Sequence, residues 1–163
     1  MKKLKRKGMK RLLTIHMITA SIWLGSVVSM WVFAYLLFFQ MSEVEFLISA
    51  RWLPMIYIFV VLPASVTTML EGLVYGIFTT WGFIKHRWII LKWILAILTD
   101  VITGAGVIRE SFMTINRVSE QGFVGGFRDG GLIMGFISIQ VVLLLVVMVV
   151  SMYKPKLKKV SAN

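Results

Sequence analysis

The sequence lacks cysteine altogether, and it holds only two histidines and seven Asp and Glu residues among 163 positions. A chain without cysteine forms no disulfide, thiolate metal site, iron–sulfur cluster or cysteine nucleophile. Two histidines are too few for two haems that are each held by a histidine pair. Charged residues make up 15% of the chain, whereas an average soluble domain has about 25%. The shortage of charge therefore argues against a water-soluble protein.

Apolar residues are abundant instead, and they gather in long stretches. Residues 12–39 contain no Asp, Glu, Lys or Arg. Because a helix rises about 1.5 Å per residue and the hydrocarbon core of a bilayer is about 30 Å thick, this stretch can cross a membrane. Three further stretches have the same character. We predict an all-α, polytopic membrane protein, a single domain over residues 1–163 built as a four-transmembrane-helix bundle, with helices at about 12–39, 53–84, 88–108 and 132–153.

The distribution of charge predicts the topology. Most of the 18 Lys and Arg residues lie in residues 1–11, in the link at 85–87 and in the tail at 154–163. All carboxylates outside the predicted spans lie in the two other links. The positive-inside rule then places both termini in the cytoplasm, in a multi-pass protein of the cell membrane. We expect the basic N-terminus and tail to contact anionic lipid headgroups rather than nucleic acid.

Small residues and prolines predict how the helices pack and bend. Ser42 and Glu45 have the spacing of a capping box and predict a helix start before the second span. Pro63 lacks a backbone N–H and predicts a kink in the second helix. Gly104 and Gly106 loosen the end of the third helix. Small residues that recur every four positions predict one packing face on each of the first two helices. On the first helix this face consists of Ser21, Gly25 and Ser29, and on the second it consists of Thr68, Gly72, Gly76 and Thr80.

Ionisable side chains inside a span are candidates for function, because an unpaired charge there is costly. Counting residues from the predicted cytoplasmic ends places His16 and Lys92 in one layer, roughly 6 Å below the interface. The same count places Glu71 and Asp100 together near mid-membrane. We take His16 as a candidate metal or haem ligand, and Lys92, Glu71 and Asp100 as candidate catalytic residues. Alternatively, Lys92 extends its head group to the interface, His16 is a core residue, and the carboxyl groups only join helices.

Further ligands for a metal come from two other positions. His86 lies in a link between two basic residues, and Met148 of the fourth span reaches about the depth of His16. The chain has 11 methionines, and thioethers suit copper(I), which makes copper an alternative cofactor. Most of the methionines are scattered, so adaptable packing is the other interpretation.

Short motifs between residues 12 and 104 resemble those of known membrane proteins. Residues 16–25, which begin with His16 and contain Trp23, are similar to the first helix of CopD-type and related integral membrane proteins, and more distantly of the HemJ family. The later progression of Pro63, of Glu71 followed by glycine, and of residues 88–92 ending in Lys92 supports this resemblance.

The resemblance implies a function. HemJ proteins are four-helix membrane proteins that bind haem b and are linked to protoporphyrinogen oxidation, with a histidine of the first helix and a lysine of the third as their functional pair. By position these are His16 and Lys92, with Trp23 beside the cofactor. CopD-type proteins are associated with copper handling.

We therefore expect a haem b-binding redox protein in which His16 is an axial ligand and Lys92 faces a propionate or a substrate. His86 and Met148 are candidates for the second axial position, and a quinone or a porphyrin is the expected ligand. Two alternatives stay open. One is a copper-, cation- or proton-handling bundle that uses Glu71 and Asp100, and the other is a non-catalytic membrane subunit. In each of these cases the protein can assemble as a homo-oligomer.

Overall fold

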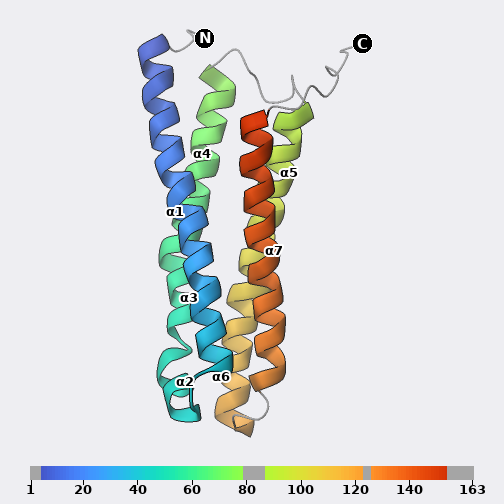
Figure 1. Ribbon diagram of the computed structural model, residues 1–163. Helices are drawn as coiled ribbons and strands as arrows, with labels where there is room; N and C mark the ends of the chain where they lie inside the picture. Colours follow the sequence, from blue (N-terminus) through green and yellow to red (C-terminus); the bar gives the residue numbers. More distant parts are fainter. Residues whose placement is uncertain (1–4, 79–86, 123–125, 154–163) are drawn as a thin grey trace.

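The computed structural model describes residues 5–78, 87–122 and 126–153. Within those ranges all regular structure is helical, and four helices are long and apolar enough to cross a membrane. They run side by side in an elongated bundle, in which the start of the first and the end of the last lie at one end, called the terminal end below (Figure 1). The prediction of an all-α, four-helix membrane bundle is confirmed at this level. The candidate spans are Lys7–Phe39, Glu43–Phe78, Arg87–Glu120 and Asp129–Tyr153.

The first and last spans are continuous α-helices. Helix α1 covers Arg6–Phe39, so it begins within the basic segment that we predicted to precede the span. Lys, Arg, Met and Leu are good helix formers, which explains the early start. Helix α7 covers Gly126–Tyr153 and begins before the predicted residue 132. Asp129 in its first turn favours this start, because a carboxylate is stabilised near a helix N-terminus.

The second span is divided into α2 (Glu43–Ser49), α3 (Trp52–Ile56), the π-helical segment η1 (Tyr57–Val61) and α4 (Leu62–Phe78). The predicted capping box is present, since the backbone N–H of Ser42 donates to Oε2 of Glu45 at 2.8 Å. The wide turns of η1 come directly before Pro63. Proline has no N–H to donate and its ring clashes with a carbonyl one turn earlier, so a wider turn relieves the strain.

The third span is longer than predicted. It comprises α5 (Arg87–Val101), a second π-helical segment η2 (Ile102–Ile108) and α6 (Arg109–Gln121). The helix continues past the predicted span end at residue 108 into the first half of the following link, and it ends at Gly122, whose φ of 79° suits glycine. Gly106 in η2 permits close packing, since a Cβ atom there would lie 2.9 Å from Cγ of Phe136.

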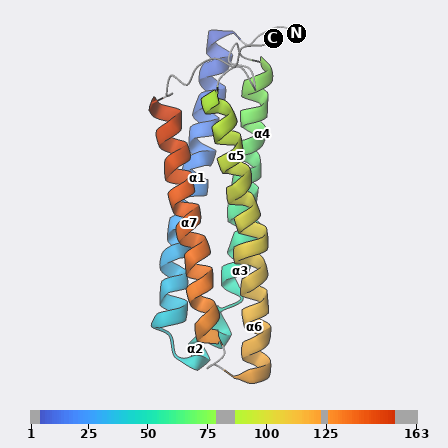
Figure 2. The same cartoon turned by 90° about the vertical axis from the view of Figure 1, so that its right-hand side faces the viewer.

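Helix α1 packs against both α4 and α7, and α5 packs against α7 (Figures 1 and 2). The half of the bundle away from the terminal end has a mostly apolar interior. Its fully buried side chains come from all four spans and include Val27, Ala34, Leu53, Val61, Val107, Ile133 and Ile137. Polar interior side chains gather in the other half, at the boundary between the two, and at the end opposite the terminal end, where Ser111, Thr114 and Asp129 are buried.

The predicted packing face of the first helix is wrong. Ser21, Gly25 and Ser29 are exposed, and a Cβ atom on Gly25 would meet nothing within 4 Å. The buried face of α1 instead carries larger side chains, among them Trp23 and Val27. A four-residue repeat defines a helix face but not its direction, and bulky apolar side chains gain more from burial.

The predicted face of the second helix agrees with the structure where it is described. Thr68 is buried, and a Cβ atom on Gly72 would lie 3.6 Å from the ring of Trp93 in α5. Thr80 lies outside the described residues.

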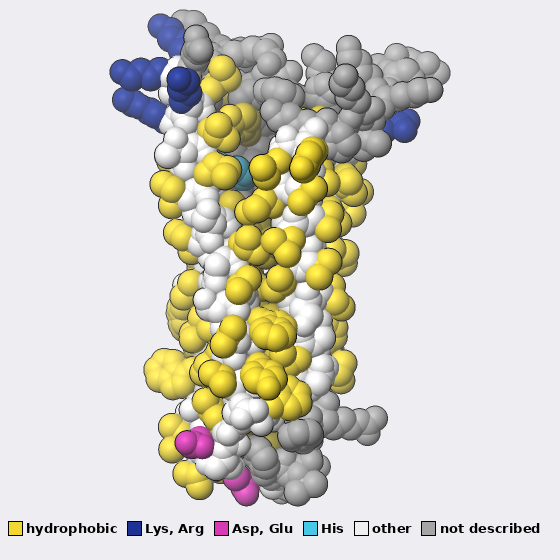
Figure 3. Space-filling view, viewed as in Figure 1, with side chains coloured by type: hydrophobic (Ala, Val, Ile, Leu, Met, Phe, Trp, Pro, Cys, Tyr) yellow, Lys and Arg dark blue, Asp and Glu magenta, His cyan; other side chains and the backbone are white. Residues whose placement is uncertain are grey.

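Charged side chains are separated along the bundle. On the face shown in Figure 3, Lys and Arg side chains gather at the terminal end, and the visible carboxylates lie at the opposite end. The basic and acidic side chains, which lie in different links of the sequence, therefore also lie at opposite ends of the bundle on this face.

Candidate functional site

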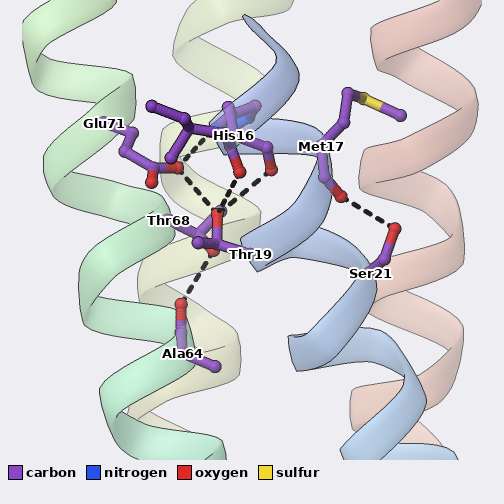
Figure 4. Close-up of polar contacts among 8 residues, drawn as sticks. His16, Met17, Thr19, Ser21, Ala64, Thr68 and Glu71 are labelled. Carbon is purple, nitrogen blue, oxygen red and sulfur yellow. Dashed lines mark hydrogen bonds and ion pairs between the residues drawn. The ribbon is translucent and has the colours of Figure 1, made fainter. Parts of the chain in front are cut away.

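The site begins with a histidine and a carboxylate on facing helices (Figure 4). Nδ1 of His16 in α1 lies 3.3 Å from Oε2 of Glu71 in α4. Nδ1 is buried and has no hydrogen-bond partner within the described part of the chain, so the contact is an ion pair only when the imidazole is protonated. Thr19, one turn after His16, donates from Oγ1 to the same carboxylate oxygen at 2.7 Å. Glu71 is therefore held by two side chains of α1.

The contacts of Glu71 matter because its side chain is largely buried. The exposed fraction of the side chain is 11% for Glu71 and 23% for His16. A carboxylate this buried requires partners, because water cannot solvate it. Thr68, one turn before Glu71, donates its hydroxyl proton to the carbonyl of Ala64 at 2.7 Å and so does not serve Glu71. His16 and Thr19 are thus the contacts shown for this carboxylate.

A third helix brings a positive charge to the same place. Lys92 in α5 lies close enough to His16 for their charges to interact. Its Nζ lies 6.0 Å from the centre of the Trp88 ring, within the range of a cation–π contact. The structure thus places His16 of α1 in contact with Glu71 of α4 and within electrostatic reach of Lys92 of α5.

The prediction that Glu71 shares a layer with Asp100 is wrong, because Glu71 contacts His16. Because it contacts His16, Glu71 lies nearer to the terminal end than the count along the second span indicates. The neighbour of the Asp100 carboxyl group on α4 is Ser65.

Trp23, Ser65 and Asp100 form a deeper layer. Trp23 follows His16 along α1, while Ser65 precedes Glu71 along the antiparallel α4, so both lie about 10 Å further from the terminal end. Nε1 of Trp23 and Oδ1 of Asp100 are buried and lack hydrogen-bond partners among the described residues. We call the two layers together the polar cluster, which comprises His16, Thr19, Trp23, Ser65, Glu71, Lys92 and Asp100.

Gln140 of α7 lies fully buried at the boundary with the apolar half. Its Oε1 accepts a hydrogen bond from the Tyr57 hydroxyl at 2.9 Å. Its Nε2 donates to the carbonyl of Thr99 at 3.3 Å and to the hydroxyl of Thr103. We call this group the Gln140 junction. We did not single out Gln140 or Tyr57 from the sequence, although a lone amide within an otherwise uncharged span was an available signal.

A salt bridge closes the far end of the bundle. Nη1 of Arg117 in α6 lies 2.6 Å from Oδ2 of Asp129 in α7, and Thr114 donates to the same oxygen at 3.4 Å. The Asp129 side chain is buried, whereas that of Arg117 is 40% exposed. The pair joins α6 to α7 directly beside the link between them.

Of the other predicted metal ligands, only Met148 lies among the described residues. Met148 is half-buried on α7, whereas the His16 imidazole faces Glu71 of α4 (Figure 4). His86 lies outside the described residues. Among residues 5–78, 87–122 and 126–153, no group of three or more His, Asp and Glu side chains is arranged to hold a metal ion.

An open depression of about 650 Å³ runs along α1, apart from the polar cluster. Met17 and Ser21 belong to its lining, and both point away from Glu71 (Figure 4). The depression is therefore a feature of the outer surface of the bundle.

Comparisons with protein-family models, with curated proteins and with solved structures gave no match for this chain. The resemblance to CopD-type and HemJ proteins stays a prediction that rests on the motifs.

Proposed function

We propose that the protein is a redox protein of the cell membrane that binds haem b through His16. The observation that carries the proposal is the contact between Nδ1 of His16 and the buried carboxylate of Glu71. Histidines that ligate metals usually hold their second ring nitrogen against a carboxylate or a carbonyl, which fixes the orientation of the ring. In this arrangement Nε2 of His16 is the atom that would bind iron.

The donor set fits a haem. The porphyrin itself supplies four nitrogen ligands, so one or two protein ligands complete the coordination of the iron. His16 supplies one ligand, and the Lys92 ammonium supplies a charge that would pair with a propionate. A copper or other metal ion without a porphyrin needs more protein ligands, which His16 and Glu71 provide only in part.

Each residue then has a distinct part. The bound haem would accept and release one electron. Glu71 orients the His16 ring and, through its negative charge, makes the imidazole a stronger electron donor, which favours the oxidised iron. Thr19 holds Glu71 in place. The partners that fit this site are a lipid-soluble electron carrier such as a quinone, or a porphyrin substrate.

We also propose that the terminal end faces the cytoplasm. The gathering of Lys and Arg side chains at this end supports the orientation, because positive loops are retained on the cytoplasmic side. The polar cluster would then lie in the cytoplasmic half of the membrane, close to anionic lipid headgroups.

The visible spectrum of the purified protein tests the haem proposal. Expression with a haem supply should give a Soret band, and His16→Ala should abolish it. Glu71→Gln keeps the shape of the side chain but removes its charge, and should weaken haem binding by about 10–100-fold. His86→Ala tests the second axial position: it should retain the haem, and it should change the spectrum only if His86 is the second ligand.

Two results would contradict this function. One is the absence of a Soret band from well-folded protein, and the other is a band that His16→Ala leaves unchanged. Copper found by metal analysis in place of haem would favour the copper-handling alternative.

A further inference from the structure

The open depression on the outer surface of α1 lies within the stretch at 12–39 that is predicted to cross the membrane. Its described lining residues all belong to α1, and they are Leu13, Thr14, Met17, Ile18, Ser21 and Ile22. The four apolar side chains among them are each about half exposed. Residues 13 to 22 extend for about 14 Å along the helix axis, so an acyl chain can lie against them over much of its length.

Three exposed cations continue the same face of α1 toward the terminal end. They are Lys7, Lys10 and Arg11. Each of them precedes a lining residue of the depression by seven positions, or almost two full turns, so all three project on the side of the depression. Thr14 donates from Oγ1 to the carbonyl of Lys10 at 3.1 Å, within the same continuous helix. Because side chains lean toward the N-terminus of a helix, the cations reach out of the hydrocarbon core.

The charge at this end of α1 is of one sign. The first carboxylate of the chain is Glu43, so α1 itself carries no acidic side chain beside the cations. Figure 3 shows Lys and Arg side chains at the terminal end, with apolar side chains following along the bundle. A molecule that lies along this face therefore meets positive charge at the membrane boundary and apolar surface below it. An acidic phospholipid presents the complementary order, an anionic headgroup followed by acyl chains.

We propose that this face of α1 binds one acidic phospholipid at a defined site. An acyl chain occupies the depression, and the phosphate of the headgroup pairs with Lys7, Lys10 and Arg11. The Arg11 guanidinium can donate to two phosphate oxygens at once, while the two ammonium groups act as point charges. The site does not depend on haem, because Met17 and Ser21 point away from the polar cluster (Figure 4).

Binding of lipid to the full chain in a non-ionic detergent, measured by native mass spectrometry, tests the proposal. Phosphatidylglycerol should bind more tightly than phosphatidylcholine with the same acyl chains, because the phosphatidylcholine headgroup has no net charge. One cation near the membrane surface strengthens the attraction of acidic lipid by about 5-fold. Replacing both Lys7 and Lys10 by glutamine should therefore weaken phosphatidylglycerol binding by about 25-fold and leave phosphatidylcholine binding unchanged.

The matched control for this variant replaces Lys5 and Arg87 by glutamine. It removes the same charge from the same end of the bundle, because Arg87 begins α5 there (Figure 1). Lys5 precedes the inward-facing His16 by about three turns and so lies on the other side of α1. The control should lose less than about 5-fold in phosphatidylglycerol binding, the effect of one cation.

A second pair of variants tests the part played by the depression. Ser21→Phe fills it, whereas Ser29→Phe adds the same ring about two turns further along the exposed face, outside the lining. The two serines are equivalent, since their hydroxyls donate to carbonyls of α1 at 2.7 Å and 2.9 Å. Ser21→Phe should weaken the binding of both phospholipids by about 4-fold or more, the contribution of one buried CH₂ group, and Ser29→Phe should leave it unchanged.

Three results would overturn the proposal. They are equal affinities of the wild-type protein for the two phospholipids, equal losses in the double lysine variant and its control, and unchanged binding in Ser21→Phe. Glycerol 3-phosphate, which has the phosphate without acyl chains, should not compete, and competition equal to that of the whole lipid would also refute the site. Since the chain lacks cysteine, Ser21→Cys supplies a single thiol. A disulfide-linked dimer of this variant in the membrane would show that a second copy, not a lipid, covers this face.

Discussion

The hydrogen bond between Tyr57 and Gln140 joins the second span to the fourth in the middle of the bundle, where both side chains are fully buried. Tyr57→Phe removes the donor and leaves one lone pair of Gln140 without a partner. A hydrogen bond between membrane helices contributes about 0.6 kcal/mol on average and up to about 1.7 kcal/mol. We expect this variant to lower the free energy of unfolding by about 1 kcal/mol, because the 2.9 Å bond is well formed.

Gln140→Leu should be more destabilising. It removes the bonds to Tyr57, Thr99 and Thr103 together, and it leaves the Tyr57 hydroxyl buried without an acceptor. An unsatisfied buried group costs about 1–3 kcal/mol, so we expect a loss of about 2 kcal/mol. In the double variant both partners of the Tyr57 bond are apolar. The combined loss should then be about 2 kcal/mol rather than about 3 kcal/mol, a coupling of about 1 kcal/mol.

Unfolding of the protein in mixed micelles by a denaturing detergent, followed by circular dichroism, measures these differences. The bond from Trp31 to Ser138 provides the control, because Trp31 is exposed and the same pair of truncations should be nearly neutral and additive. Additive losses for Tyr57→Phe and Gln140→Leu would show that the junction does not act as a unit. A Gln140→Leu variant as stable as wild type would refute the reasoning on unsatisfied groups.

Two further substitutions probe the packing of the bundle. Gly106→Ala would place a Cβ atom 2.9 Å from Phe136 and should destabilise by about 1–3 kcal/mol, whereas Gly104→Ala meets nothing within 4 Å and should be tolerated in the same unfolding assay. Asp129→Asn removes the charge that pairs with Arg117 and should lower the unfolding free energy by about 1–2 kcal/mol, less than for a fully buried pair because Arg117 is partly exposed. High salt should not remove the loss of stability caused by Asp129→Asn, since the Asp129 carboxylate is buried.

The number and order of the membrane helices could be predicted from the sequence, because long uncharged runs in a chain so poor in charge are typical of membrane spans. Helix ends were less predictable. Residues 6–11 and 109–121 are helical although both segments are charged, since hydropathy detects the hydrocarbon core and not the helix that extends beyond it.

Depth along the helices was predicted only in part. His16 and Lys92 lie within electrostatic reach, as the count predicts, but Glu71 joins them instead of Asp100. The count depends on where each helix ends, and an error of one or two turns moves a residue to another layer. Gln140 and Tyr57 of the junction escaped prediction because they are neutral, and a search for charged groups passes over them.

The two π-helical segments alter which residues share a side of the bundle. An α-helix turns by about 100° per residue, and a π turn takes one additional residue to close. Segments η1 and η2 therefore act as phase shifts of about 100° between the polar half of the interior and the apolar half. Deleting one residue within Tyr57–Val61 would restore a uniform α-helix and turn the Tyr57 hydroxyl away from Gln140. The number of residues in η1 and η2, more than the identity of those residues, determines which side chains of the two halves lie on the same side of a helix.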